Sequence, residues 1–171
     1  MIIVNNKLIT FAGPLRRRAD APGSAPVGDP FAWRHQIAVA PSGPDGEGEI
    51  ASVRTPHRAA EAEFHRLDDD RLERTASLGS YPSHEFGSRD LDRAAAADFD
   101  GDGQPELLVP APETGILAGL RRTGDGVAEV WRVDAGAPLS SNVAAARGVD
   151  GVVLAAGTPE GLRIWPALGQ C

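Results

Sequence analysis

The stretch that decides the fold is Asp98-Phe99-Asp100-Gly101-Asp102-Gly103-Gln104-Pro105-Glu106. It places acidic side chains at positions 1, 3, 5 and 9 of a loop, with glycines at positions 4 and 6. Ca²⁺ takes several oxygen ligands in a flexible geometry, and alternate acids on a turning backbone can converge on one ion. The carbonyl oxygen of Gln104 is available at position 7. Without a cation these like charges repel one another. The spacing therefore predicts a Ca²⁺ loop, and the competing interpretation is a solvated acidic turn.

Two other loop classes share part of this pattern. An EF-hand loop needs a bidentate Glu at position 12, where this chain has Val109 within the apolar run Leu107-Leu108-Val109. The loop therefore leads into a strand, which excludes the EF-hand. A haloacid-dehalogenase phosphatase motif also begins with Asp-x-Asp-Gly. It needs an apolar strand before the nucleophile and a Thr after the Gly, whereas this chain has residues 94–97, all Ala, and then Asp102.

At these residues the chain resembles the FG-GAP (VCBS-type) repeat of integrin α-subunit propellers and many bacterial surface proteins. Phe86-Gly87 stands at the family's Phe-Gly position, and Pro110-Ala111-Pro112 stands where the family has Gly-Ala-Pro, with Pro in place of the Gly. The resemblance covers roughly residues 33–168 and is specific around residues 86–112. It implies a β-propeller fold and the Ca²⁺ side-chain ligands Asp98, Asp100, Asp102 and Glu106.

An internal repeat supports this interpretation, because propellers repeat with a period of about 40–50 residues per blade. Residues 37–51 align without gaps with residues 94–108. Pro41 and Gly43 replace the first two acids in the earlier copy, so we expect weak or no cation binding there. The loop residues retained in both copies are, pair by pair, Asp45 and Asp102, Gly46 and Gly103, and Glu49 and Glu106.

A third copy at residues 152–157 lacks the acidic loop, and Gly148-Val149-Asp150-Gly151 is interpreted as a plain turn. The triplets Thr55-Pro56-His57, Ala111-Pro112-Glu113 and Thr158-Pro159-Glu160 each follow a short apolar run. We therefore expect an all-β partial propeller of about three blade-like antiparallel units. These blades are assigned to residues 31–171, and residues 1–30 are interpreted as a flexible N-terminal tail.

Strand patterns fill the segments between the loops. Ala62 and Phe64 alternate with Glu63 and His65, which predicts a half-buried strand with the polar residues facing solvent. Thr123-Gly124-Asp125-Gly126 is a turn signal. Residues 94–97 are Ala-rich and could extend a helical turn capped at residue 88, but the aligned residues 37–40 favour a strand.

The segment after this turn is expected to form a strand with one regular face. Val127, Glu129, Trp131 and Val133 occupy alternate positions. Because strand side chains alternate between the two faces of a sheet, all four are predicted to lie on the same face. The Gly and Pro content of the chain, 20 and 14 of 171 residues, also favours short strands over long helices.

Bulk properties limit the functional classes. The net charge of −7 argues against nucleic-acid binding, which depends on basic surface. No stretch is long enough to span a membrane, and no signal peptide is recognised because Arg16-Arg17-Arg18 follows the N-terminal apolar run. The single cysteine, Cys171, excludes an intrachain disulfide. The affinities of extracellular Ca²⁺ modules, about 10⁻⁴–10⁻³ M, favour an extracytoplasmic location.

Catalytic patterns are poor. The four histidines are scattered in sequence, His65 is expected to face solvent, and only His57 lies on a loop of the kind that carries binding residues. Ser140-Ser141 and Ser83-His84-Glu85 lack the glycines of a nucleophile elbow. We therefore predict no enzymatic activity, and the alternative is a metal-dependent hydrolase of phosphate or sugar substrates using the acidic loop.

The predicted function is a Ca²⁺-stabilised interaction or scaffold module that binds an unknown protein or carbohydrate ligand. Propellers typically have about 4–8 blades, whereas this chain supplies about three. Unpaired blade edges invite self-association. Three outcomes remain open: self-assembly into a closed ring, an incomplete propeller capped by the N-terminal segment, or a fragment of a longer propeller.

Overall fold

A computed structural model describes residues 2–4, 7–9, 33–56, 60–68 and 71–166. All regular elements in these ranges are β-strands, so the all-β class is confirmed. The strands are β1 (Ile2–Val4), β2 (Lys7–Ile9), β3 (Arg34–Ala40), β4 (Glu49–Arg54), β5 (Glu61–Asp68), β6 (Arg71–Leu78), β7 (Ala95–Ala97), β8 (Glu106–Pro110), β9 (Ile116–Thr123), β10 (Gly126–Asp134), β11 (Val143–Gly148), β12 (Gly151–Thr158) and β13 (Gly161–Trp165).

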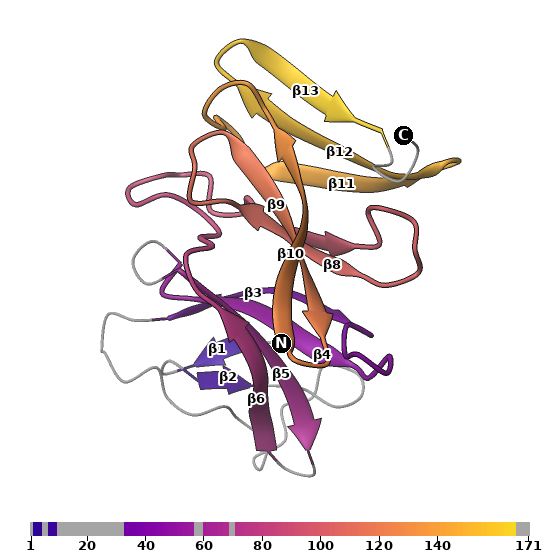
Figure 1. Cartoon of the computed structure of the whole chain (residues 1–171). Coiled ribbons are helices and arrows are strands. Elements are labelled where there is room, and N and C mark those ends of the chain that lie inside the picture. Colours follow the sequence, from indigo (N-terminus) through magenta and orange to yellow (C-terminus); the bar gives the residue numbers. More distant parts are fainter. Residues whose placement is uncertain (1, 5–6, 10–32, 57–59, 69–70, 167–171) are drawn as a thin grey trace.

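Three antiparallel sheets form successive layers of the molecule (Figure 1). Blade 1 has the strand order β3-β4-β5-β6, blade 2 has β7-β8-β9-β10, and blade 3 has β11-β12-β13. Among the first strands of the blades, β7 contacts both β3 and β11, as neighbouring inner strands of a propeller do. The expected arrangement of about three blade-like units is therefore confirmed.

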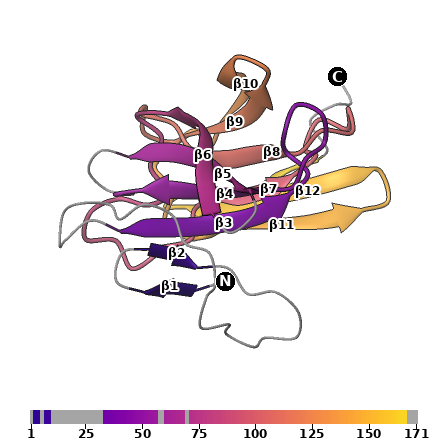
Figure 2. The same cartoon turned by 90° about the horizontal axis from the view of Figure 1, so that it is seen from below.

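A separate hairpin of β1 and β2 lies on the blade 1 side of the molecule (Figure 2). The remainder of residues 1–30 lies outside the described ranges, so the interpretation of this segment as a flexible tail stays a prediction. No helix in the described part of the chain is long and apolar enough to cross a membrane.

Two apolar clusters join the blades. Between blades 1 and 2, Val53 and Phe64 pack with Val109 and Leu120. Between blades 2 and 3, the cluster includes Leu108, Leu117 and Leu154. Blade 2 is therefore covered on both faces, and residues of β8 and β9 belong to both clusters.

The expected turns at residues 123–126 and 148–151 are present, and the strand expected at residues 94–97 forms at residues 95–97. Thr123 pairs with Gly126 across the β9–β10 turn, and Gly148 pairs with Gly151 across the β11–β12 turn. Strand β7 forms instead of a helix because its three alanines pair with β8. The loop after β7 and the plain turn in blade 3 therefore stand where the repeat pattern placed them.

Strand β5 differs from its predicted half-buried pattern. Ala62 and Phe64 face blade 2 as expected, but Glu63 and His65 on the other face are also buried. The prediction that His65 faces solvent is therefore wrong. Glu63 tolerates burial because arginines neutralise it. These are Arg34 (Nε to Oε2, 2.6 Å), Arg54 (Nε to Oε1, 3.2 Å) and Arg74 (Nη1 to Oε1, 3.2 Å).

Strand β10 contains a bulge that overturns the predicted single face. Glu129 pairs with Leu120, but Trp131 pairs with Gly119, so Val130 is the extra residue. A bulge of one residue reverses the side-chain alternation that follows it. Val127 therefore packs on the blade 1 side, whereas Trp131 and Val133 pack on the blade 3 side.

The bulge places the ring of Trp131 directly over Gly119. A Cβ atom added at Gly119 would lie 2.1 Å from Cε2 of Trp131. We expect Gly119→Ala to lower the free energy of unfolding by about 1–3 kcal/mol, because the ring must move out of the core between blades 2 and 3. Urea unfolding measures this change.

The matched control for this substitution is Gly124→Ala in the β9–β10 turn, where an added Cβ meets nothing within 4 Å. Gly124→Ala should leave the urea midpoint close to that of the wild type. Equal urea midpoints for the two variants would show that the packing of the Trp131 ring does not require a glycine at residue 119.

Candidate functional site

The acidic loop connects β7 to β8, and its own carboxylates shape its backbone. The N–H groups of Gly101 and Gly103 donate to Oδ1 and Oδ2 of Asp98 at 2.7 and 3.0 Å. Both glycines have positive φ, +81° and +93°, which side chains other than glycine rarely adopt. The N–H of Asp102 donates to Oδ1 of Asp100 at 3.2 Å. The glycines therefore let the chain turn tightly around Asp98.

Three of the predicted ligands converge. Oxygens of Asp98, Asp100 and Glu106 all lie within 4.8 Å of one another, the one such group of metal-binding side chains in the described ranges. Asp102 and Gln104 lie on the exposed rim, where the N–H of Gln104 donates to Oδ1 of Asp102 at 2.9 Å. The structure thus brings together loop positions 1, 3 and 9, and the assignment of all five residues as ligands stays a prediction.

Glu106 anchors the loop to the core. It is the first residue of β8, it is 1% exposed, and its Oε2 accepts the N–H of Phe99 at 2.9 Å. Phe99 is also buried, and its ring meets the edge of Trp131 at 5.6 Å between centroids. Burial raises the pKa of Glu106. A buried carboxylate of this kind needs a positive partner.

Sequence reasoning missed that partner, Arg121 of β9. Its Nη2 lies 2.6 Å from Oδ2 of Asp100, its Nη1 lies 2.7 Å from Oδ2 of Asp102, and its Nε donates to Oε1 of Glu106 at 3.0 Å. Burial lowers the pKa of Arg121, but its hydrogen bonds to Glu106 and Asp100 outweigh that effect and raise it. One guanidinium therefore bridges three acids of the loop.

The equivalent loop of blade 1 keeps the buried glutamate but lacks the first two acids of the cluster. Glu49 begins β4 as Glu106 begins β8, and it is 0% exposed. Its partners are the Nε of Arg122 at 2.9 Å and the Oγ1 of Thr75 at 2.8 Å. Gly46 keeps a positive φ of +80°, as Gly103 does. The alignment of the two loops therefore corresponds to equivalent positions in the two blades.

The donor set of the blade 2 loop fits a hard divalent cation. It supplies oxygen atoms alone, from three side chains that are already close, on a loop whose backbone bonds do not require the ion. The four acids of the loop outnumber the single positive charge of Arg121. A cation bound here would share these carboxylates with Arg121 or displace it.

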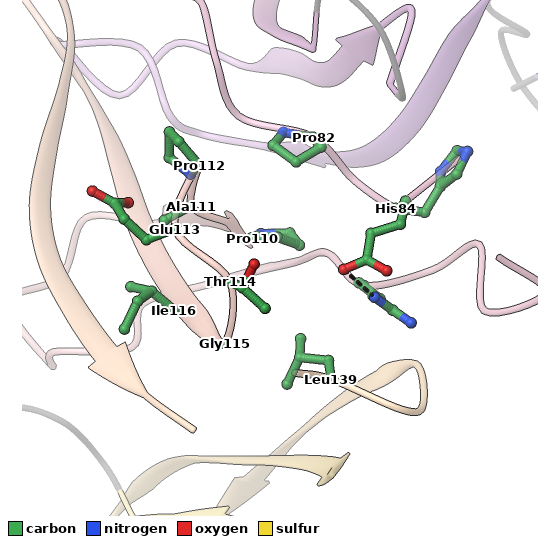
Figure 3. A pocket seen from close by; sticks show the side chains of 12 residues that line it. Pro82, His84, Pro110, Ala111, Pro112, Glu113, Thr114, Gly115, Ile116 and Leu139 are labelled. Atoms are coloured by element: carbon green, nitrogen blue, oxygen red, sulfur yellow. Dashed lines mark ion pairs between the residues drawn. The ribbon is translucent and has the colours of Figure 1, made fainter. Parts of the chain in front are cut away.

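A second concave feature lies at one end of the blades (Figure 3). This pocket has a volume of about 210 Å³ and is lined by Pro82, His84, Glu85, Arg93, residues 110–116 and Leu139. An ion pair between Glu85 and Arg93, 3.4 Å from Oε1 to Nη1, lies in it. Pockets for drug-sized ligands usually have about 300–1,000 Å³. This pocket therefore suits a single side chain or sugar substituent rather than a whole cofactor.

The structure also brings together histidines that are distant in the sequence. The rings of His35 and His84 lie 6.1 Å apart, and Nδ1 of His35 lies 2.7 Å from Oγ of Ser83. Nε2 of His35 lies 3.9 Å from Oδ1 of Asp92. This order resembles a nucleophile, base and acid, but Ser83 is 0% exposed, so a substrate has no access to its hydroxyl. His57 lies outside the described residues.

Comparison with known families finds an FG-GAP repeat at residues 92–128. No curated protein and no solved structure matches the chain. The matched segment runs from before β7, through the acidic loop, into β10, and Phe86-Gly87 lies just before it. FG-GAP repeats are in general non-catalytic units of propellers and interaction modules. Residues 92–128, which contain most of blade 2, therefore match the FG-GAP repeat, and the all-β fold with its blade-like sheets is consistent with an FG-GAP/VCBS-type repeat protein.

Proposed function

We propose that this chain is a non-catalytic interaction or scaffold module whose blade 2 loop is stabilised by Ca²⁺. The observation that carries the proposal is the convergence of Asp98, Asp100 and Glu106 on a loop anchored in the core. A divalent cation would supply the positive charge that Arg121 alone does not. By joining the end of β7 to the start of β8, it would hold the turn of the blade closed.

Thermal unfolding with Ca²⁺, with Mg²⁺ and with chelator tests the proposal. Ca²⁺ at a hundredfold excess over its dissociation constant should add about 2.7 kcal/mol to the free energy of unfolding, and Mg²⁺ should add less because it demands stricter octahedral geometry. Asp100→Ala should abolish the Ca²⁺ shift. Asp45→Ala, in the equivalent loop of blade 1, is the matched control and should retain it.

Arg121 provides a further arm of this experiment. Arg121→Met removes the guanidinium group that would compete with Ca²⁺ for the carboxylates of Asp100, Asp102 and Glu106. The variant should therefore unfold at a lower temperature in chelator and show a larger Ca²⁺ shift than the wild type. An absent Ca²⁺ shift in both proteins would reject a Ca²⁺ role for the loop.

The hydrolase alternative has a separate test in the same preparation. Mg²⁺-dependent hydrolysis of a generic phosphate ester, lost in Asp100→Ala, would support it and would contradict the non-catalytic role.

For the interaction module, we propose a protein or carbohydrate ligand bound through the loops at the ends of the blades. We further propose an extracytoplasmic location, where the Ca²⁺ concentration is high enough to saturate a site with a dissociation constant of about 10⁻⁴–10⁻³ M. We propose no nucleic-acid partner.

A further inference from the structure

The last layer of the molecule ends in an apolar sheet surface. In β12 every second residue is buried against blade 2, and the residues between them lie on the opposite side. Strand register adds the side chains of β11 and β13 that share this side. We call this surface the outer face of blade 3; it consists of Ala144, Ala146, Val153, Ala155, Gly157, Leu162 and Ile164.

This face is open to solvent. Leu162 is 69% exposed and Ile164 is 61% exposed. The seven positions include no charged or polar side chain, and the side chains of Ser140 and Ser141 border the face at Gly157. Exposed apolar surface that is gathered on one face of a sheet marks an interaction site more often than scattered apolar residues do.

The internal repeat shows what such a face does in the other blades. The triplets that begin at Ala111 and Thr158 align blade 2 with blade 3, so Leu108 corresponds to Ala155 and Leu117 corresponds to Ile164. Leu108 and Leu117 are both 0% exposed, because blade 3 covers them. The outer face of blade 3 therefore has the composition and position of a face that receives another sheet.

The opposite end of the stack has different chemistry. The face of blade 1 that points away from blade 2 carries the network of Glu61 and Glu63 with Arg54 and Arg74. The side chains of Arg54 and Arg74 are 30% and 50% exposed. Covering them with an apolar sheet would remove their hydration without supplying new partners, which is unfavourable. A head-to-tail contact between copies is therefore disfavoured.

We propose that a second copy of this chain covers the outer face of blade 3 with its own outer face, around a twofold axis. Like surfaces meet in such an isologous contact, so apolar side chains pack on apolar side chains. We expect a reversible dimer whose population rises with protein concentration.

Blade 3 offers a second reason for association at this end. Blades 1 and 2 each have a fourth strand beyond the third, whereas β13 is the last strand of its sheet in the described chain. An unpaired sheet edge presents backbone donors and acceptors that favour association. Because the edge adjoins Leu162 and Ile164, a partner that covers the face also shields the edge.

Sedimentation velocity of the full chain over a hundredfold concentration range tests the proposal. The wild type should shift from monomer to dimer as its concentration rises. Ile164→Glu and Leu162→Glu, which place a charge on the face, should each remain monomeric. Val149→Glu, in the β11–β12 turn, is the matched control, because Val149 is fully exposed but lies off the face. It should dimerise as the wild type does.

Three results would overturn the proposal: a wild type that is monomeric throughout, a ladder of larger oligomers, or dimerisation of both face variants. Circular dichroism of the variants confirms that they are folded, which their exposed positions favour. The dimer should persist in chelator because the face contains no acid. Failure of this proposal is therefore distinct from failure of the Ca²⁺ proposal.

Discussion

Replacing Arg122 by Met is expected to lower the free energy of unfolding by about 3–5 kcal/mol. Arg122 of blade 2 reaches across to Glu49 of blade 1, with Nε 2.9 Å from Oε2 and Nη2 3.4 Å from Oε1. Glu49 is 0% exposed, so the substitution leaves a buried carboxylate whose remaining bond comes from Thr75. Chemical denaturation of the purified protein measures the change.

Two comparisons establish the cause of this loss. Arg132→Met removes the same charge from surface pairs with Glu113 and Glu129 and should have a smaller effect, because solvent screens surface pairs. Glu49→Leu combined with Arg122→Met removes both charges and should recover most of the stability. If Arg122→Met destabilises no more than Arg132→Met does, the bridge between blades 1 and 2 contributes little.

The second large effect is a loss of stability in acid, which we assign to His65. Burial lowers the pKa of His65 from 6.5 to about 4. Glu63, 3.8 Å away, and Glu49 favour the charged ring, while Arg34 and Arg74 oppose it, and burial dominates. The unfolded chain therefore takes up the proton first as the pH falls. The stability due to neutral His65 is complete above pH 6.5 and is lost between pH 6.5 and about 4, by about 3 kcal/mol.

His65→Gln isolates this contribution. Urea unfolding at a series of pH values should give a steeper fall between pH 6.5 and 4 for the wild type than for the variant. Burial also lowers the pKa of His35, and that contribution is present in both proteins. Parallel curves for the wild type and His65→Gln over this window would show that the ring is not held neutral in the fold.

Much of the fold could be predicted because the decisive signals are local. The spacing of Asp98, Asp100 and Glu106 depends on neighbouring residues, and the glycines between them determine the turn. The repeat was recognisable because the first loop keeps Glu49 and Gly46 at the matching positions. The structure is consistent with this retention, since both glutamates are buried at the first residue of a strand and each binds an arginine of β9.

The parts that could not be predicted depend on contacts between distant residues. The alternation in β5 indicates one exposed face, but an arginine network allows Glu63 to be buried there. The bulge at Val130 follows from register against β9, so the sequence of β10 alone does not reveal it. Arg121 lies 15 residues after Glu106 and reaches it because the neighbouring residues Leu107 and Leu120 are paired between β8 and β9.

Adjacent residues of a strand point to opposite faces of its sheet, and β9 uses this geometry with two arginines. Arg121 holds the acidic loop of its own blade, while Arg122 holds the buried glutamate of the blade before it. A single strand therefore carries charge partners for both sides at once. Separating blade 1 from blade 2 would leave Glu49 and Arg122 buried without each other, so these two blades are expected to lose their structure together and not one after the other.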